Sequence, residues 1–156
     1  LNEYLEFASH QKYEKTDLVD INNIIKNIKQ KYEGKNIKLS LEENLEINIR
    51  PNSINRCLIN LINNALTYGK NVEIITKKIL GDIIILIEDD GPGIPENEYQ
   101  NVLKPFYRID KSRGQNKLGV GLGLSIANDI IRSHGGNISM ERSEMNGLRV
   151  KISLPS

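Results

Sequence analysis

The chain has 156 residues and a net charge of +1, with acidic and basic residues spread along its length. This length fits one domain with a sizeable core, and the balanced charge gives no indication of a nucleic-acid-binding surface. The single cysteine, Cys57, excludes an internal disulfide and a cysteine-based zinc cluster. The sequence contains neither a secretory signal nor an apolar run long enough to cross a membrane, so we expect a cytoplasmic location.

Two helices are predicted in the first part of the chain. Residues 1–11 place apolar side chains on one helical face and are typical of the end of a longer helix, and residues 12–17 are predicted to form a linker. Asp20 can cap a second helix, which has an apolar face with a helical period and ends at Gly34.

Two strands are expected after this helix. In residues 37–41 and 45–49, apolar residues alternate with polar ones. The polar residues 43–44 between these segments predict a hairpin.

The helix predicted to begin at Pro51 carries a polar stripe beside its apolar face. Arg56, Asn60 and Asn64 are spaced four apart, so their side chains line up along the helix. Asparagine is a poor helix former, so its repetition calls for a reason. One explanation is a ligand-binding face, and the other is a solvated face in an asparagine-rich protein. The apolar face consists of Ile54, Cys57, Leu58, Leu61, Ile62, Ala65 and Leu66.

The apolar run at residues 83–87 predicts a central strand that is buried on both faces. Asp89 and Asp90 follow it, with Gly91 and Gly93 just beyond. A carboxylate at the end of a buried strand is costly unless it is hydrogen-bonded, and glycine lets a flat ligand approach the backbone. These four residues predict the floor of a ligand pocket, with an ordinary Asp-Gly turn as the alternative.

The rest of the chain combines turns, a long loop and a helix. Hairpins are predicted around residues 81–82 and 144–147, and a short helix at 95–102. Residues 104–117 are basic and aperiodic, and they belong to a loop long enough to form a lid. The elements together predict an α/β sandwich (α+β), with a mixed, mainly antiparallel sheet and three main helices on one face.

A glycine-rich segment containing Gly119, Gly121 and Gly123 opens the helix that extends to His134. Backbone N–H groups at a helix N-terminus bind phosphate, with the helix dipole in support. Neither a P-loop nor a dinucleotide-binding fingerprint is present. Together with the carboxylate, the amide stripe and the basic loop, the glycines predict a nucleotide site. A carboxylate there can accept the amine of a base, and amide oxygens can bind a hard cation.

Four motifs occur in the order found in the catalytic ATP-binding domain of sensor histidine kinases, the Bergerat fold shared with gyrase, Hsp90 and MutL. The chain resembles that family over residues 17–155, and its ending is similar to the EnvZ osmosensor branch. The motifs are the N box (residues 60–68), the first glycine box (89–93), the F box (104–108) and the second glycine box (119–124).

The resemblance implies ATP and Mg²⁺ as cofactors and gives roles to individual residues. Asp89 would accept the adenine amine, Gly93 would let the purine approach, and Tyr68 would line the adenine pocket. Asn60 would bind Mg²⁺ and act in catalysis, with Asn64 near the phosphates. The further residues implied to bind ATP are Gly91, Ile94, Phe106, Lys117, Gly119, Val120, Gly121, Leu122, Gly123 and Leu124.

The resemblance also implies that Arg108 and Arg113 are catalytic lid groups for the γ-phosphate. The family pattern is not matched everywhere. Thr67 stands where the family usually has Lys or Arg, and Leu103 and Lys104 replace the usual Phe and Glu of the F box. These differences concern one phosphate contact and the docking of the lid.

The resemblance implies that residues 1–15 end a dimerisation and phosphoacceptor helix and its linker, and that residues 16–156 form the catalytic domain. The acceptor histidine of the family is not found, because His10 lacks its sequence context. The implied partners are the dimerisation domain of the same receptor and a response regulator, but not nucleic acid. We expect a monomeric fragment from a homodimeric receptor, in the cytoplasmic portion of a bacterial inner-membrane protein.

Three other functions are considered. An ATPase of the gyrase, Hsp90 or MutL type activates water with a Glu four residues before the N-box Asn, and here that position is Asn60, which cannot act as a general base. A degenerate, non-catalytic nucleotide sensor stays open because of Thr67 and Lys104. An anti-sigma-factor serine kinase is disfavoured by the helical residues 1–11 and by the F box.

Overall fold

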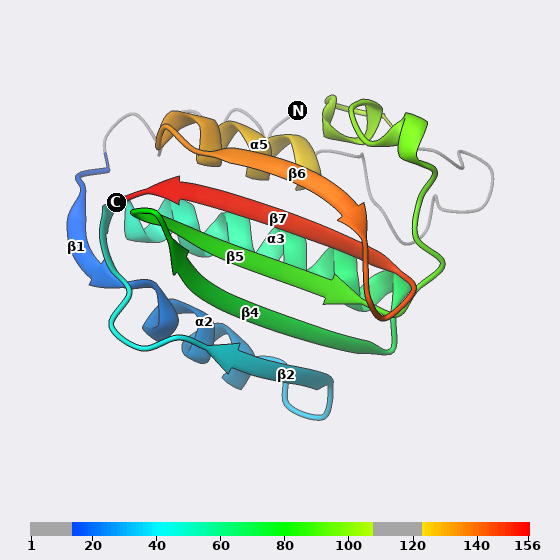
Figure 1. Cartoon of the computed structure of the whole chain (residues 1–156), viewed down its shortest axis with the longest axis horizontal. Helices are drawn as coiled ribbons and strands as arrows, with labels where there is room; N and C mark the ends of the chain where they lie inside the picture. Colours follow the sequence, from blue (N-terminus) through cyan, green and yellow to red (C-terminus); the bar gives the residue numbers. More distant parts are fainter. Residues whose placement is uncertain (1–13, 108–122) are drawn as a thin grey trace.

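The computed structural model describes residues 14–107 and 123–156, whose elements form two layers (Figure 1). Helices cover one face of a five-stranded sheet. In sheet order the strands are β2 (Asn36–Leu41), β4 (Asn71–Ile79), β5 (Asp82–Asp89), β7 (Leu148–Pro155) and β6 (Asn137–Arg142). The helices are α2 (Ile21–Gln30), α3 (Pro51–Tyr68) and α5 (Gly123–Ser133). The predicted α/β sandwich is therefore confirmed.

The sheet is mainly antiparallel. Strand β5 pairs antiparallel with both β4 and β7, β6 pairs antiparallel with β7, and β2 pairs parallel with β4. The hairpins predicted around residues 81–82 and 144–147 are therefore confirmed. A separate two-stranded sheet joins β1 (Asp17–Asp20) to β3 (Glu46–Ile49).

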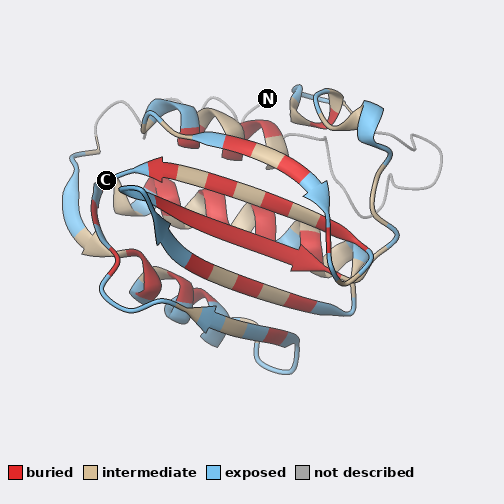
Figure 2. Ribbon diagram, in the orientation of Figure 1, coloured by how far each residue is buried: buried red, intermediate tan, exposed pale blue. Residues whose placement is uncertain are grey.

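Strand β5 forms the centre of the sheet, as its apolar run predicts. All of its residues from Ile83 to Asp89 are buried, and Figure 2 shows burial along nearly the whole strand. Ile83, Ile85 and Ile87 belong to the core that the sheet shares with the helices. Ile84 and Leu86 are also buried, although they lie on the opposite face because side chains alternate along a strand.

The predicted hairpin between residues 37–41 and 45–49 is wrong. Strand β2 joins the main sheet beside β4, whereas β3 pairs with β1. The connection explains the separation: Glu42 N donates to Thr76 O of β4 (3.1 Å), and Ile21 N at the start of α2 donates to Leu45 O (3.0 Å). The two ends of the turn are thus attached to different partners far away in the sequence.

Local signals locate the starts of α2 and α3, whereas α2 ends at Gln30, before the predicted Gly34. Asp20 caps α2 through its Oδ1, which accepts from Asn22 N (2.9 Å), and α3 begins at Pro51, as predicted. The short helix expected at 95–102 is replaced by two 3₁₀ turns, η1 (Glu96–Glu98) and η2 (Asn101–Leu103). Strand β1 was missed, because four half-exposed residues next to an expected linker carry no clear alternation.

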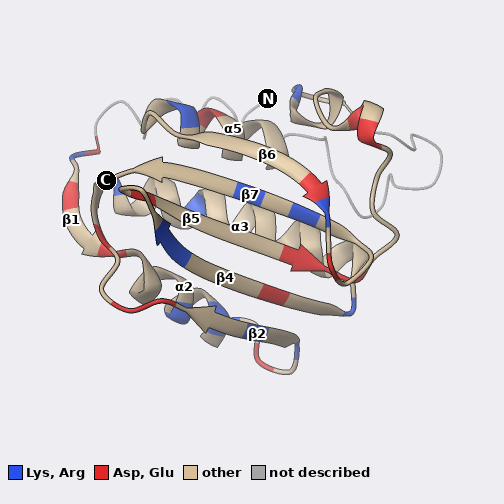
Figure 3. Cartoon of the chain, in the orientation of Figure 1, with Lys and Arg blue, Asp and Glu red and all other residues tan. Residues whose placement is uncertain are grey.

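Acidic and basic side chains are interspersed over the described elements, and acidic residues lie where β5 ends (Figure 3). Among residues 14–107 and 123–156, no helix is long and apolar enough to span a membrane. The end of β5 faces the C-terminal end of α3 on one side and the β6–β7 turn (residues 143–147) on the other. This end of the sheet contains the candidate site.

Candidate functional site

Asp89, the last residue of β5, carries a buried carboxylate, and the residue is 4% exposed. Its Oδ1 accepts hydrogen bonds from Gly91 N (2.9 Å) and Leu148 N (3.1 Å). Burial raises the pKa of the Asp89 carboxyl above its ordinary value, and these two hydrogen bonds oppose the rise. In the described part of the chain both hydrogen bonds found on this carboxylate use Oδ1, so Oδ2 is available to a ligand.

Glycines close the space around Asp89. A methyl group on Gly91 would lie 2.7 Å from the carbonyl oxygen of Tyr68, at the end of α3. A methyl group on Gly147 would lie 2.3 Å from both the carbonyl oxygen and Oδ1 of Asp89. Gly93 has a φ of +72°, which favours glycine. The first glycine box is therefore packed between α3 and the β6–β7 turn, with room for backbone alone.

Asp90 differs from its neighbour. Its Oδ1 accepts from Lys70 N (2.8 Å) and Asn71 N (3.0 Å), and its Oδ2 accepts from Asn71 Nδ2 (2.7 Å). Its bonds to the backbone and side chain of Asn71 lower the pKa of the Asp90 carboxyl. Asp90 thus fixes the connection between α3 and β4, whereas the sequence predicted it on the pocket floor beside Asp89. Asp90 lies just beyond the last residue of β5, where its carboxylate reaches the backbone of the α3–β4 connection.

Helix α3 brings the N-box residues to the same end of the molecule. Asn60 is partly buried, and its Nδ2 donates to the carbonyl of Gly123 (3.4 Å), the first residue of α5. Asn64 is partly buried one turn further on, and Tyr68, 44% exposed, ends the helix beside Gly91. The structure therefore brings the N box, the first glycine box and the end of the second glycine box together.

The residues that depart from the family pattern make contacts close to their own positions in the chain. Thr67 Oγ1 donates to the carbonyl of Asn63 in its own helix (2.8 Å). Lys104 Nζ donates to Asn101 Oδ1 (3.1 Å), and Leu103 is partly buried against the core. Neither Thr67 nor Lys104 has a described contact with the Asp89 region.

Two predicted ATP-binding residues lie on the segment that follows the first glycine box. Ile94 is partly buried against the core, whereas Phe106 is 51% exposed and has a φ of +66°. Leu124, in the first turn of α5, is partly buried against the core. The predicted residues Arg108, Arg113, Lys117, Gly119, Val120, Gly121 and Leu122 lie outside the described residues, so their roles stay predictions.

A divalent cation would depend on amide oxygens here. In the described ranges 14–107 and 123–156, no group of three or more His, Cys, Asp or Glu residues is placed to hold a metal ion. Because Asn60 Nδ2 donates to Gly123 O, its Oδ1 remains available as a ligand. An amide oxygen together with phosphate oxygens suits a hard cation such as Mg²⁺. The residues present therefore fit the predicted ion.

Comparison with known proteins agrees with this geometry. The family model described as "Histidine kinase-, DNA gyrase B-, and HSP90-like ATPase" matches residues 49–156, which is more than half of the chain. The chain belongs to this family. The relatives described next are sensor histidine kinases, so the predicted type of domain, the ATP-binding domain of sensor histidine kinases, is confirmed.

Individual relatives support the same assignment. The sensor histidine kinase GtrS of Pseudomonas aeruginosa is 38% identical over 106 residues, which cover 68% of this chain and 22% of GtrS. The ATP-binding domain of PrrB from Mycobacterium tuberculosis superposes with a TM-score of 0.74 at 25% identity, covering 91% of this chain and 98% of that one. The kinase domain of the Escherichia coli osmosensor EnvZ gives 0.68 at 29% identity, with 89% and 88% covered. The chain spans about a quarter of the length of the curated relatives it matches.

Sequence reasoning missed two features of the site. Gly147 was expected only as part of a turn, and Leu148 only as the start of a strand. Both residues reach the site through the register of the sheet, because the pairing of β7 with β5 brings this turn beside Asp89. That pairing links residues about 60 positions apart, so no local pattern indicates it.

Proposed function

We propose that this domain transfers the γ-phosphoryl group of Mg-ATP to a histidine on the dimerisation domain of the same receptor, for relay to a response regulator. The proposal rests chiefly on the carboxylate of Asp89, with one oxygen held by two backbone N–H groups at the end of a buried strand. Its Oδ2 would accept the exocyclic amine of adenine, and Gly91 and Gly93 keep side chains away from the base.

The phosphates would lie between Asn60 and the N-terminus of α5. The N–H groups and dipole of a helix N-terminus favour an anion there. Asn60 would bind Mg²⁺ through Oδ1, and Asn64 would lie near the phosphates. The cation, when bound with ATP, offsets the charge of the triphosphate. The chain itself would contribute positioning of the nucleotide, and Arg108, Arg113 and Lys117 would add positive charge from the lid.

Transfer to histidine is favoured over ATP hydrolysis by the residue at position 60. The related ATPases use a glutamate there as a general base, and the amide of Asn60 cannot take up a proton from water. The partly buried amide is instead attached to the start of α5. A nucleotide sensor without catalytic activity remains the second candidate, because Thr67 and Lys104 make only local contacts.

We further propose that residues 16–156 form the catalytic domain and that residues 1–15 lead into it from a dimerisation helix. The domain would be monomeric alone and part of a homodimer in the full receptor. It would lie in the cytoplasmic portion of a bacterial inner-membrane protein. These proposals follow from the resemblance to sensor kinases and from the small share of those relatives that the chain covers.

Calorimetry with ATP, ADP and GTP tests the nucleotide assignment. GTP has a carbonyl group where ATP has the amine, so it would face the Asp89 carboxylate unfavourably, and we expect discrimination of up to about 10⁴-fold. Asp89→Ala should abolish ATP binding. Asp82→Ala, at the exposed other end of the same strand, is the matched control and should bind ATP normally. Equal affinity of the unmodified chain for GTP and ATP would refute the assignment.

Incubation with labelled ATP tests the reaction. Alone, the chain should neither label itself nor hydrolyse ATP appreciably. A separate fragment that carries the dimerisation helices and acceptor histidine should become labelled, and the label should be acid-labile and base-stable, as phosphohistidine is. Rapid hydrolysis by the chain alone would favour the ATPase, and tight ATP binding without transfer would favour the sensor.

A further inference from the structure

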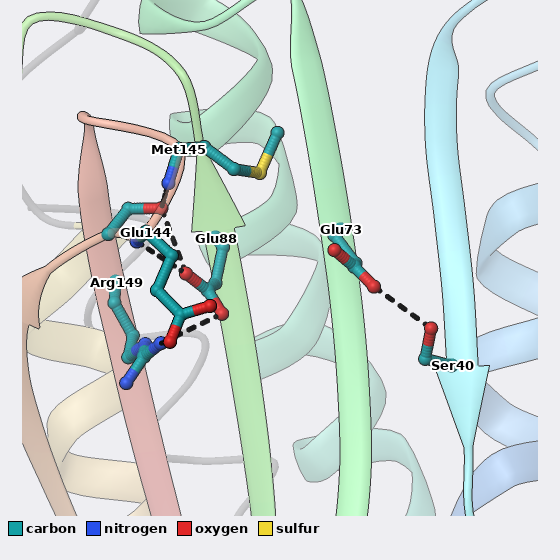
Figure 4. Close-up of polar contacts among 7 residues, drawn as sticks. Ser40, Glu73, Glu88, Glu144, Met145 and Arg149 are labelled. Atoms are coloured by element: carbon teal, nitrogen blue, oxygen red, sulfur yellow. Dashed lines mark hydrogen bonds and ion pairs between the residues drawn. The ribbon is translucent and has the colours of Figure 1, made fainter.

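Glu88 is a buried carboxylate to which the proposed ATP site assigns no role. It immediately precedes Asp89 on β5, so its side chain extends to the opposite face of the sheet (Figure 4). The residue is only 3% exposed. Burial of a carboxylate is costly unless charged and hydrogen-bonding groups compensate it, so its partners reveal what it holds in place.

Among the described residues, the hydrogen-bond partners of Glu88 belong to the β6–β7 turn and the start of β7. Its Oε1 accepts from Ser143 Oγ (2.9 Å) and Glu144 N (3.2 Å), and its Oε2 accepts from Arg149 Nη2 (3.2 Å). Ser143 is itself buried, and its Oγ also accepts from Met145 N (2.9 Å). The carboxylate therefore holds both sides of the turn (Figure 4).

The same turn contacts Asp89 on its other side. Leu148 N donates to Asp89 Oδ1, and Gly147 packs against the backbone of Asp89 and Gly91. Ser143 N donates to Gly147 O (2.9 Å), which closes the turn into one hydrogen-bonded unit. Ser143 is thus linked through Gly147 to the adjacent Leu148 N–H group, which donates to Asp89.

We propose that Glu88 is a positioning residue for the adenine-binding carboxylate. It fixes the β6–β7 turn, the turn fixes Oδ1 of Asp89 through Leu148 N and Gly147, and this leaves Oδ2 in the orientation that distinguishes adenine from guanine. The proposal rests on the proposed function of Asp89 as the adenine acceptor.

Glu73 provides a matched control. It lies on β4 directly opposite Glu88 in the strand register, and its Oε2 accepts from Ser40 Oγ of β2 (2.9 Å). Like Glu88, Glu73 is a glutamate that accepts from a serine side chain. Its described partner, Ser40, lies on the side of β4 away from the β6–β7 turn (Figure 4).

The experiment measures ATP and GTP affinities by calorimetry for the unmodified chain, Glu88→Ala, Glu88→Gln and Glu73→Ala. Glu88→Ala should weaken ATP binding about tenfold or more and reduce the preference for ATP over GTP, because the loss of residues that orient metal ligands has effects of this size and Glu88 would orient Asp89 in the same way. Glu88→Gln keeps an acceptor for Ser143 and Glu144 and should recover most of the preference. Glu73→Ala should leave both affinities unchanged.

Amide hydrogen exchange supplies a second measurement that destabilisation alone would not reproduce. Exchange at Leu148 N–H should be selectively faster in Glu88→Ala than in Glu73→Ala, compared with amides of α2. If Glu88→Ala does not fold, Ser143→Ala replaces it, with a smaller loss of preference in the same direction.

The outcomes separate the two proposals. If the folded Glu88→Ala or Ser143→Ala variant keeps the full preference for ATP over GTP and normal exchange at Leu148, the positioning role is wrong and the adenine site stands. If the unmodified chain shows no preference for ATP, the proposed function itself fails.

Discussion

The two ends of α3 differ in what their polar groups bind. At the N-terminal end, Glu14 accepts from Asn52 N (2.6 Å) and Ser53 N (3.0 Å), and Arg50 N donates to His134 Nε2 (3.1 Å). These three backbone N–H groups are thus paired within the chain. At the C-terminal end, Asp89 has one oxygen held by the backbone and the other available to a ligand.

The β4–β5 turn, before β5, and the β6–β7 turn, beside the end of β5, show the same contrast. In the β4–β5 turn, Gly81 has a φ of +90°, and a methyl group on it would meet nothing within 4 Å. In the β6–β7 turn, a methyl group on Gly147 would meet Asp89 at 2.3 Å. Gly81 is needed for its backbone conformation, whereas Gly147 is needed because a side chain there would clash with Asp89. The C-terminal end of α3 therefore has the geometry of the proposed ligand site, whereas the contacts at the N-terminal end serve stability.

Substitution of Gly147 and of Gly81 should produce the largest difference in ATP affinity between the two turns. Gly147→Ala should reduce ATP affinity by about a hundredfold or more, because the methyl group must displace Asp89 or the turn that orients it. Gly81→Ala should cost about 1 kcal/mol of folding free energy, because an L-residue is strained at positive φ, and should leave ATP affinity unchanged. Calorimetry and thermal unfolding measure both effects. Equal losses of ATP affinity in the two variants would contradict the assignment of roles.

Glu14 should affect stability alone. The residue at the N-cap position of α3 is Arg50, which makes no capping hydrogen bond, and the carboxylate of Glu14 takes over this task from 38 residues away. Glu14→Ala should therefore lower the free energy of unfolding by about 1 kcal/mol, as the loss of a helix cap does. Denaturant titration measures the change. A large loss of ATP affinity, with stability unchanged, would show that this end of α3 also belongs to the site.

Acid should weaken ATP binding before an ordinary aspartate would be protonated. Burial raises the pKa of Asp89 above 3.8, and the ionised carboxylate is the form that would accept the adenine amine. ATP affinity should thus fall as the pH decreases through that raised pKa. Asp90 should titrate below 3.8, because its hydrogen bonds with Asn71 and Lys70 favour the ionised form. Carboxyl NMR titration distinguishes the two neighbours, and a lower pKa for Asp89 than for Asp90 would contradict the assigned environments.

His134 should give the smallest effect, on stability alone. Its Nε2 accepts from Arg50 N and its Nδ1 donates to Ile130 O (2.7 Å), so the neutral ring is bound. Burial lowers the pKa of His134 below 6.5. The neutral ring thus contributes stability above pH 6.5, and this contribution is lost as the pH falls below that value toward the folded pKa. Unfolding titrations of the unmodified chain and His134→Gln should differ in slope in this window, and parallel curves would contradict the prediction.

The sequence predicts the elements with strong local patterns and misses contacts made across the fold. The apolar run of β5, the helical stripe of α3 and the glycine turns locate the sheet centre, the main helix and two hairpins. Pairing of β2 with β4, and of β1 with β3, depends on distant partners, so the local alternation predicted the wrong hairpin.

The candidate site follows the same rule. Asp89 and its glycines are predicted because a charge at the end of an apolar strand stands out in the sequence. Asp90 has the same residue type and the same neighbours, and only the structure shows that its carboxylate binds Lys70 and Asn71. The contributions of Gly147 and Glu88 come from the register between β5 and β7, which the sequence does not specify locally.

The structure of the domain with ADP bound tests the central claim most directly. We predict that the exocyclic amine of adenine lies within hydrogen-bond distance of Asp89 Oδ2, while Oδ1 keeps its bonds to Gly91 N and Leu148 N. An adenine ring held elsewhere, or one that contacts Asp90 in place of Asp89, would contradict the account.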